Sequence, residues 1–239
     1  MNSTAEQILV CLNAVAAQRA LRSQDSALAK CVAVVKAYQH ARFAHTYADM
    51  LAHARYGSAA RFFLEDLYGP GDFTSRDGQF ARIVPALVKL FPRDIVSTVL
   101  ALAQLHSLAE DLDGAMAQVL KTGVAGTAQT VAPDGVLLTE DYVCLWRHVG
   151  RVVDRERQIV LMLQVGEALD GYTHKPLLRQ TLRLMRGPAH AAGLGALQAF
   201  LERGFDTFRE MRGAAEFLGE IAQRERAMAV SLFATVNAL

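Results

Sequence analysis

The sequence contains few of the residues that cross-link or interrupt a fold. Three cysteines, six prolines and one tryptophan occur among 239 residues, and the cysteines form no CxxC pair. Such a sparse, odd number of cysteines excludes a secreted disulfide scaffold and favours a reducing compartment. No apolar stretch approaches the roughly 18 residues that a bilayer-spanning helix needs, so no membrane span is expected.

Charge of either sign is not in excess, with 25 Lys and Arg residues against 24 Asp and Glu residues. This balance excludes a strongly basic nucleic-acid-binding protein, and we expect no nucleic acid partner. A short apolar run at residues 8–17 resembles the hydrophobic part of a signal peptide, but no positive charge precedes it. The sequence therefore predicts a cytoplasmic protein.

The motifs of the common catalytic, nucleotide and metal sites are also missing. The chain contains no HExxH or ExxH, no GxSxG, no GxGxxG and no GxxxxGK followed by Ser or Thr. We therefore expect neither a metal nor a cofactor. The absence of these motifs leaves open whether the protein is an enzyme.

Helical periodicity is present almost throughout, and no strand-like alternation occurs. Apolar residues recur at helical spacing in residues 4–22, and Asp25 is placed to cap a second helix that extends to about residue 54. The sequence predicts an all-α, single-domain bundle of eight or nine helices over residues 1–239, with a surface loop at about residues 122–138. Further helices are expected at about residues 58–68, 74–90, 93–121, 139–170 and 214–234, with two more at residues 176 and 188.

The segment at residues 61–77 has the densest set of aromatic and charged side chains. Phe62 and Phe63 are expected to anchor the core, and Thr74 with Asp77 fits a capping box. The carboxylates could bind a cation or act as general acid and base, whereas the structural alternative, which we favour, is that they cap helices and pair with arginines. The binding candidates in this segment are Glu65, Asp66, Tyr68, Asp72 and Asp77.

The same segment carries a specific pattern, FFLEDLYGPxDFxxRD, at residues 62–77. Together with matching strings at residues 184–188 and 193–202, this pattern resembles an uncharacterised family of bacterial all-helical proteins. The resemblance covers most of the chain. It implies a helical protein built as one unit and supplies no activity, cofactor or catalytic residue.

His106 and Glu110 are separated by four residues, so that one helix face presents both side chains. Such a pair could ligate a metal, but pairs at this spacing more often interact with each other on a helix surface. Both residues are binding candidates, although no metal site is predicted.

Basic residues form two ridges at helical spacing. The two ridges are Arg147, Arg151 and Arg155, and Lys175, Arg179, Arg183 and Arg186. They could bind a protein partner or an anionic ligand, or they could pair with acidic helices of the same fold. The three arginines of the second ridge are binding candidates.

Apolar stripes on the helices that begin at residues 139 and 214 leave two alternatives. The stripes could be exposed and form a two-fold homodimer, or they could pack against each other inside one protomer. The sequence favours a non-catalytic helical protein that acts by partner binding or self-association. The alternative is a helical-bundle enzyme, or a carrier of a small ligand or cofactor with a site in the bundle core.

Overall fold

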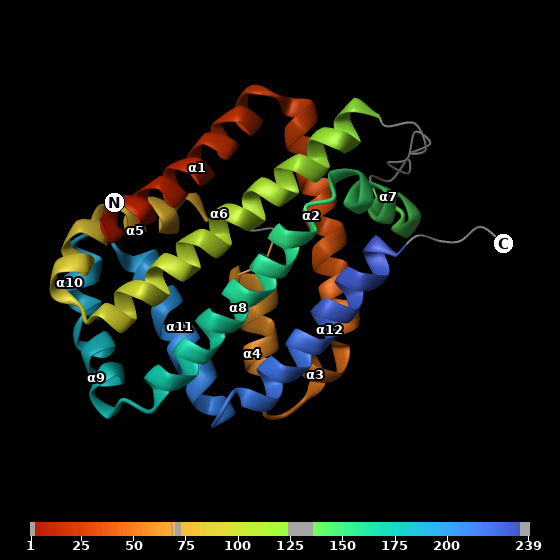
Figure 1. The fold of residues 1–239 in the computed structure, drawn as a ribbon. Coiled ribbons are helices and arrows are strands. Elements are labelled where there is room, and N and C mark those ends of the chain that lie inside the picture. The colour runs from red at the N-terminus through yellow and green to blue at the C-terminus, as the bar shows by residue number, and fades with distance from the viewer. Residues whose placement is uncertain (1–2, 68, 70–72, 124–135, 235–239) are drawn as a thin grey trace.

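The chain folds into a bundle of α-helices, as a computed structural model shows (Figure 1). The structure describes residues 3–67, 69, 73–123 and 136–234, and no β-strand occurs within these ranges. The predicted all-α class is therefore confirmed. The elements are α1 (Thr4–Gln24), α2 (Ser26–Thr46), α3 (Ala48–Ala52), α4 (Gly57–Phe62), the π-helical turn η1 (Phe63–Leu67), α5 (Thr74–Leu90), α6 (Arg93–Thr122), α7 (Thr139–Val149), α8 (Val152–Thr173), α9 (Pro176–Leu184), α10 (Arg186–Ala191), α11 (Gly195–Met211) and α12 (Ala215–Phe233).

The longest helix, α6, is the element around which the others are arranged. Its sequence is rich in Ala and Leu, which are strong helix formers, and it ends at Gly123 in a left-handed conformation with φ of 65°. Figure 1 shows α1 and α8 on either side of α6, and α2 also packs on it. Contacts with α1, α2 and α8 therefore bury three different sides of α6.

The buried apolar side chains form three clusters. The largest joins α2, α3, α4, η1, α6, α8, α11 and α12, and is built mainly from Phe, Leu and Met. A second cluster surrounds Trp146 and Tyr142 where α7 meets α2, α6 and the end of α12. The third lies between α1, α5 and α6, around Ile8 and Val84. The polar residues described below lie on faces of α6 that the three apolar clusters do not cover.

The aromatic pair at residues 62–63 lies in the largest cluster, as predicted. Phe62 stacks on Phe200 with ring centroids 5.6 Å apart, and its ring lies close to Gly204 of α11, where a Cβ atom would approach it to 3.0 Å. Phe63 meets the rings of Phe208 and Phe217 at 6.2 and 5.7 Å. The pair therefore joins α4 and η1 to both C-terminal helices.

The capping box predicted from Thr74 and Asp77 is wrong. The residue before α5 is Phe73, and no side-chain capping hydrogen bond forms there. Asp77 instead turns inward, because the Arg19 guanidinium of α1 and the His106 ring of α6 are available to its carboxylate. At α2, by contrast, the predicted cap is confirmed, since the Asp25 carboxylate accepts a hydrogen bond of 3.0 Å from the backbone N–H of Leu28.

The single helix predicted over residues 139–170 is divided into α7 and α8. Gly150 has φ of 63° and ψ of −117°, a conformation that disfavours residues with a Cβ, and Arg151 follows in the left-handed region. The Arg151 guanidinium holds this turn by hydrogen bonds to Asp111 and Asp154 at 2.6 and 2.7 Å. Similar breaks, such as the one at Tyr47 between α2 and α3, raise the number of helices above the predicted eight or nine.

The apolar stripes of α7, α8 and α12 pack mainly against each other within the protomer. Trp146 of α7 lies 5.7 Å from Phe233 of α12, and Ile159 of α8 shares a cluster with Phe217 and Ile221 of α12. The second of the two alternatives for these stripes is thus the one that the structure adopts. The exposed Val153 is an exception on this face.

The predicted surface loop at about residues 122–138 lies mostly outside the described residues. Among the helices that are described, none combines the length and the apolar composition that a transmembrane segment requires.

Phe63→Ala is expected to lower the free energy of unfolding by about 3–5 kcal/mol, because the ring is almost fully buried and its loss leaves a cavity. Phe91→Ala is a suitable control, since that ring is 45% exposed. Urea denaturation of both variants measures the difference. Equal stabilities of Phe63→Ala and the wild type would contradict the anchoring role of the pair.

Candidate functional site

Three polar side chains of α6, which we call the α6 polar row, point into the protein. They are His106, Glu110 and Asp113, at positions i, i+4 and i+7 of one helix face. Glu110 and Asp113 are buried, and His106 is half-buried. Buried charges require partners, so the contacts of each member show what it can do chemically.

Glu110 is held by two cations from two helices. Its carboxylate pairs with Arg22 of α1 and accepts a hydrogen bond of 2.5 Å from Nζ of Lys36 of α2. Arg22 also donates to the backbone carbonyl of Glu110 at 3.1 Å. Burial alone would raise the pKa of Glu110, but Lys36 and Arg22 lower it to about 2. A carboxylate with this pKa stays ionised and is not suited to act as a general acid.

The second member, His106, pairs with Asp77 of α5. The His106 Nε2 and Asp77 Oδ2 atoms lie 2.8 Å apart, and Arg19 of α1 donates to the same Oδ2 at 2.8 Å. Arg76 approaches the other carboxylate oxygen at 3.4 Å. Burial raises the pKa of Asp77, but His106, Arg76 and Arg19 together lower it. The structure therefore brings together two of the predicted candidates that are 29 residues apart in the chain.

The third member, Asp113, was not a candidate from the sequence. Burial raises its pKa, and Gln39 of α2 donates to Oδ1 at 3.0 Å. Nearby, the Arg155 guanidinium lies 3.8 Å from the centre of the Trp146 ring, and its Nη2 contacts the Met116 sulfur at 3.1 Å. The Arg155 Nε atom is buried without a hydrogen-bond partner among the described residues. Asp113 and Arg155 attract each other electrostatically across this interior.

The remaining candidates of the 61–77 segment do not join the α6 polar row. Arg203 of α11 donates to Asp66 Oδ1 at 2.5 Å, and Arg76 donates to the Asp66 backbone carbonyl at 2.9 Å. Glu65 is exposed. Tyr68 and Asp72 lie outside the described residues. These contacts agree with the structural alternative, in which the carboxylates pair with arginines.

The second basic ridge is divided between paired and unpaired side chains. Arg179 donates to Asp206 at 2.9 Å, and Arg186 donates to both carboxylate oxygens of Glu202. Arg183 is exposed and forms no direct ion pair with the described residues, but its charge helps to lower the pKa of Glu202. Most of this ridge therefore pairs within the fold, and Arg183 is the exception.

The first basic ridge serves the fold at each of its positions. Arg147 donates to the carbonyl of Leu232 at 2.9 Å near the end of α12. Arg151 holds the turn between α7 and α8, and Arg155 is buried beside Trp146. We therefore assign no ligand to this ridge.

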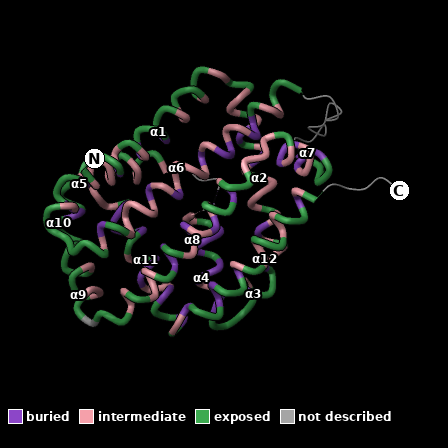
Figure 2. The backbone as a smooth tube through the Cα atoms, in the orientation of Figure 1, coloured by how far each residue is buried: buried purple, intermediate pink, exposed green. Residues whose placement is uncertain are grey.

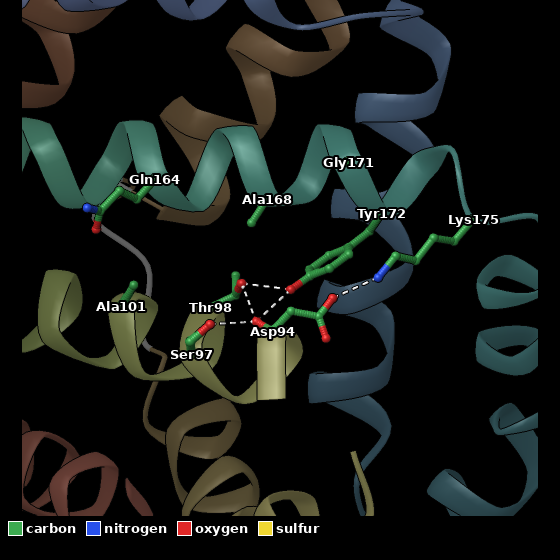
Figure 3. A pocket seen from close by; sticks show the side chains of 9 residues that line it. All are labelled: Asp94, Ser97, Thr98, Ala101, Gln164, Ala168, Gly171, Tyr172 and Lys175. Carbon is green, nitrogen blue, oxygen red and sulfur yellow. Dashed lines mark hydrogen bonds and ion pairs between the residues drawn. The ribbon is translucent and has the colours of Figure 1, made fainter. Parts of the chain in front are cut away.

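A pocket of about 480 Å³ lies between the start of α6 and the end of α8 (Figure 3). Tyr172 of α8 reaches across it, and its hydroxyl lies 2.7 Å from Thr98 Oγ1 and donates to the backbone carbonyl of Asp94 at 2.9 Å. Lys175 pairs with the Asp94 carboxylate at 2.7 Å. No sequence pattern predicted this pocket beyond Lys175, because its lining comes from two helices that meet only in the folded protein.

A groove of about 320 Å³ lies between α8 and α12, and we call it the α8–α12 groove. Leu163 and Leu218 supply its apolar surface, and Glu167 and Asp170 supply two carboxylates. The Oδ1 atom of Asp170 is inaccessible to solvent and has no hydrogen-bond partner among the described residues. The groove is therefore apolar with an acidic side.

The outer side of α9 is apolar and exposed. Leu177, Leu184 and the following Met185 are 71%, 78% and 48% exposed, and none of the residues described in α9 is buried. Figure 2 shows α9 and α10 as largely exposed segments. We call Leu177, Arg183, Leu184 and Met185 the α9 ridge. Leu177 and Leu184 share one side of α9, and Arg183 and Met185 flank it. Exposed apolar side chains grouped in this way are typical of a contact surface.

Metal binding has no support from side-chain geometry in the described part of the chain. No group of three or more His, Cys, Asp or Glu residues is arranged there to hold a metal ion. The Asp77 carboxylate that pairs with His106 is also bound by Arg19 and Arg76, which take the place that a metal ion would need.

The chain matches a family over most of its length. The family is described as "Domain of unknown function (DUF8198)", and the match covers residues 18–238. No curated protein and no solved structure matches the chain. The family description names no activity, in agreement with the resemblance to an uncharacterised family.

Glu110→Gln is expected to lower the free energy of unfolding by about 3 kcal/mol at pH 7, since a pKa near 2 replaces the ordinary 4.5 on folding. Because the pKa of Glu110 is lower in the folded state, its ionised form stabilises the protein at pH values above the pKa that it has in the unfolded state. The difference from the wild type should therefore shrink as the pH falls from about 4.5 to about 2.

Denaturant titrations at several pH values measure this difference. The exposed Glu210 provides the control, because Glu210→Gln should change stability by less than about 0.5 kcal/mol at any of these pH values. A difference between Glu110→Gln and the wild type that stays constant with pH would contradict the assignment.

Proposed function

We propose that this chain, which belongs to the DUF8198 family, is a non-catalytic helical protein that acts by association through the α9 ridge. The observation that supports the proposal is the exposure of Leu177 and Leu184 on one side of α9, with the exposed Met185 directly after the helix. Burying such side chains against a partner is favourable by about 25 cal/mol per Å² of apolar surface. A bacterial origin and a cytoplasmic location belong to the same proposal.

The polar chemistry of the interior supports association over catalysis. Glu110 and Asp77 each pair with cations that hold them ionised, and these contacts join α1, α2, α5 and α6. Such pairs fix how helices pack, and neither Glu110 nor Asp77 lines the pocket between α6 and α8 or the α8–α12 groove. The ionic groups thus serve the fold, and the exposed surface is the better candidate for function.

A second candidate function is the binding of a small ligand in the pocket between α6 and α8. Its volume of about 480 Å³ lies within the range of known ligand pockets. A ligand would have to compete with the contacts among Asp94, Thr98, Tyr172 and Lys175. An absorption spectrum or elemental analysis that revealed a bound chromophore or metal in the purified protein would favour this second function.

Photo-crosslinking in the cells that produce the protein tests the association. A photoreactive amino acid at position 184 is expected to give a defined crosslinked product, and the added substitution Leu177→Ser should abolish it while the melting temperature stays unchanged. The matched control is position 230, because Val230 is 71% exposed on α12. If position 184 gives no more product than position 230, the proposed function is wrong.

A further inference from the structure

The α9 ridge and the α8–α12 groove extend over equal lengths of helix. Leu177 and Leu184 of the ridge are seven residues apart, as are Leu163 and Asp170 on one side of the groove and Ala215 and Ala222 on the other. Seven residues correspond to about 10 Å, or two helical turns. The ridge therefore has the length that the groove can accept.

The groove is open because α12 contributes small side chains to it. Ala215, Gly219 and Ala222 follow each other at i, i+4 and i+7 and leave the space above Leu218 unfilled. Leu218 itself lies against Gly166 of α8, where a Cβ atom would come within 2.6 Å of its side chain. Small residues at such positions allow a foreign helix to approach the backbone closely.

The two surfaces are also complementary in charge. The groove carries Glu167 and Asp170, and neither carboxylate pairs with a cation among the described residues. The ridge carries Arg183, which is exposed and forms no direct ion pair with a described residue, although its charge also acts on Glu202. Opposite charges beside matching apolar surfaces favour one register of docking.

Both surfaces lie at the same end of the molecule, because α9 follows α8 after a short turn (Figure 1). When a protruding surface and its receptor lie close together on one chain, two copies can exchange them reciprocally about a two-fold axis. Such a reciprocal arrangement uses both surfaces of each copy, so it closes as a dimer.

We infer that the partner of the α9 ridge is a second copy of this chain, whose α8–α12 groove receives the ridge in a reciprocal two-fold dimer. The inference rests on the proposed function and names its partner. Leu177 and Leu184 contact Leu163 and Leu218 of the second copy, and Arg183 faces the carboxylates of its groove.

Charge reversal tests this arrangement. Sedimentation velocity from about 5 to about 500 µM, a range suited to a small interface, should show the mass rising from 26.1 kDa toward twice that value. Arg183→Glu alone and Glu167→Arg alone should each weaken the dimer at least about tenfold. An equimolar mixture of the two variants should restore it, since both contacts in the mixed dimer then join opposite charges.

Arg157→Glu is the matched control, because Arg157 is exposed on α8 outside the groove and its reversal should leave dimerisation unchanged. Circular dichroism and melting temperatures confirm that each variant is folded. A wild-type chain that stays monomeric, or single variants whose mixture fails to restore the dimer, would overturn the inference. If the photoreactive group at position 184 still crosslinks a different protein, the proposed function stands while the second copy is excluded.

Discussion

The ionic contact on which the packing of the N-terminal half depends is that of Glu110 with Arg22 and Lys36. It joins α6 to α1 and α2 at one point, and the three residues are separated by up to 88 positions in the chain. Gly114, one turn further along α6, lies against Gln18 of α1, where a Cβ atom would approach Oε1 to 3.1 Å. The close approach of α1 and the burial of the ion pair therefore depend on each other. Removing Arg22 or Lys36 would leave the buried Glu110 carboxylate with one cation instead of two, which would lower the free energy of unfolding.

Around this contact, the polar row of α6 lies between two residues that belong to apolar clusters. The row faces cations and an amide of α1 and α2 and the Asp77 carboxylate of α5, while Leu105 and Met116 belong to separate apolar clusters. Ion pairs have directional requirements that apolar contacts lack, so such a row restricts how neighbouring helices slide or rotate. The aromatic pair at residues 62–63 has the corresponding effect at the other end, where it fixes α4 against α11 and α12.

The two candidate surfaces, the α9 ridge and the α8–α12 groove, lie away from these ionic and aromatic contacts. The α9 ridge lies along a short helix without a buried residue among those described, and the groove lies where α12 contributes the small residues Ala215, Gly219 and Ala222 beside Leu218. Leu218 belongs to the largest cluster, but the exposed residues of both surfaces contribute little to the core, so substitutions of those residues can change association with little effect on stability. This separation makes the proposed interface testable independently of the fold.

The sequence by itself determined the features that depend on neighbouring residues. Helical periodicity gave the all-α class, Asp25 gave a correct helix cap, and the apolar character of Phe62 and Phe63 gave their burial. Each of these follows from hydrogen bonds or side-chain positions within a few residues, which a local pattern encodes.

Only the tertiary structure decided which distant groups meet. It placed Asp77 beside His106 and Arg19 instead of at a helix cap, and it joined Glu110 to Arg22 and Lys36. It also formed the groove from residues of α8 and α12 that are more than forty positions apart. These contacts depend on how whole helices pack against each other. Packing is the sum of many contacts between distant segments, and the spacing of neighbouring residues does not encode it.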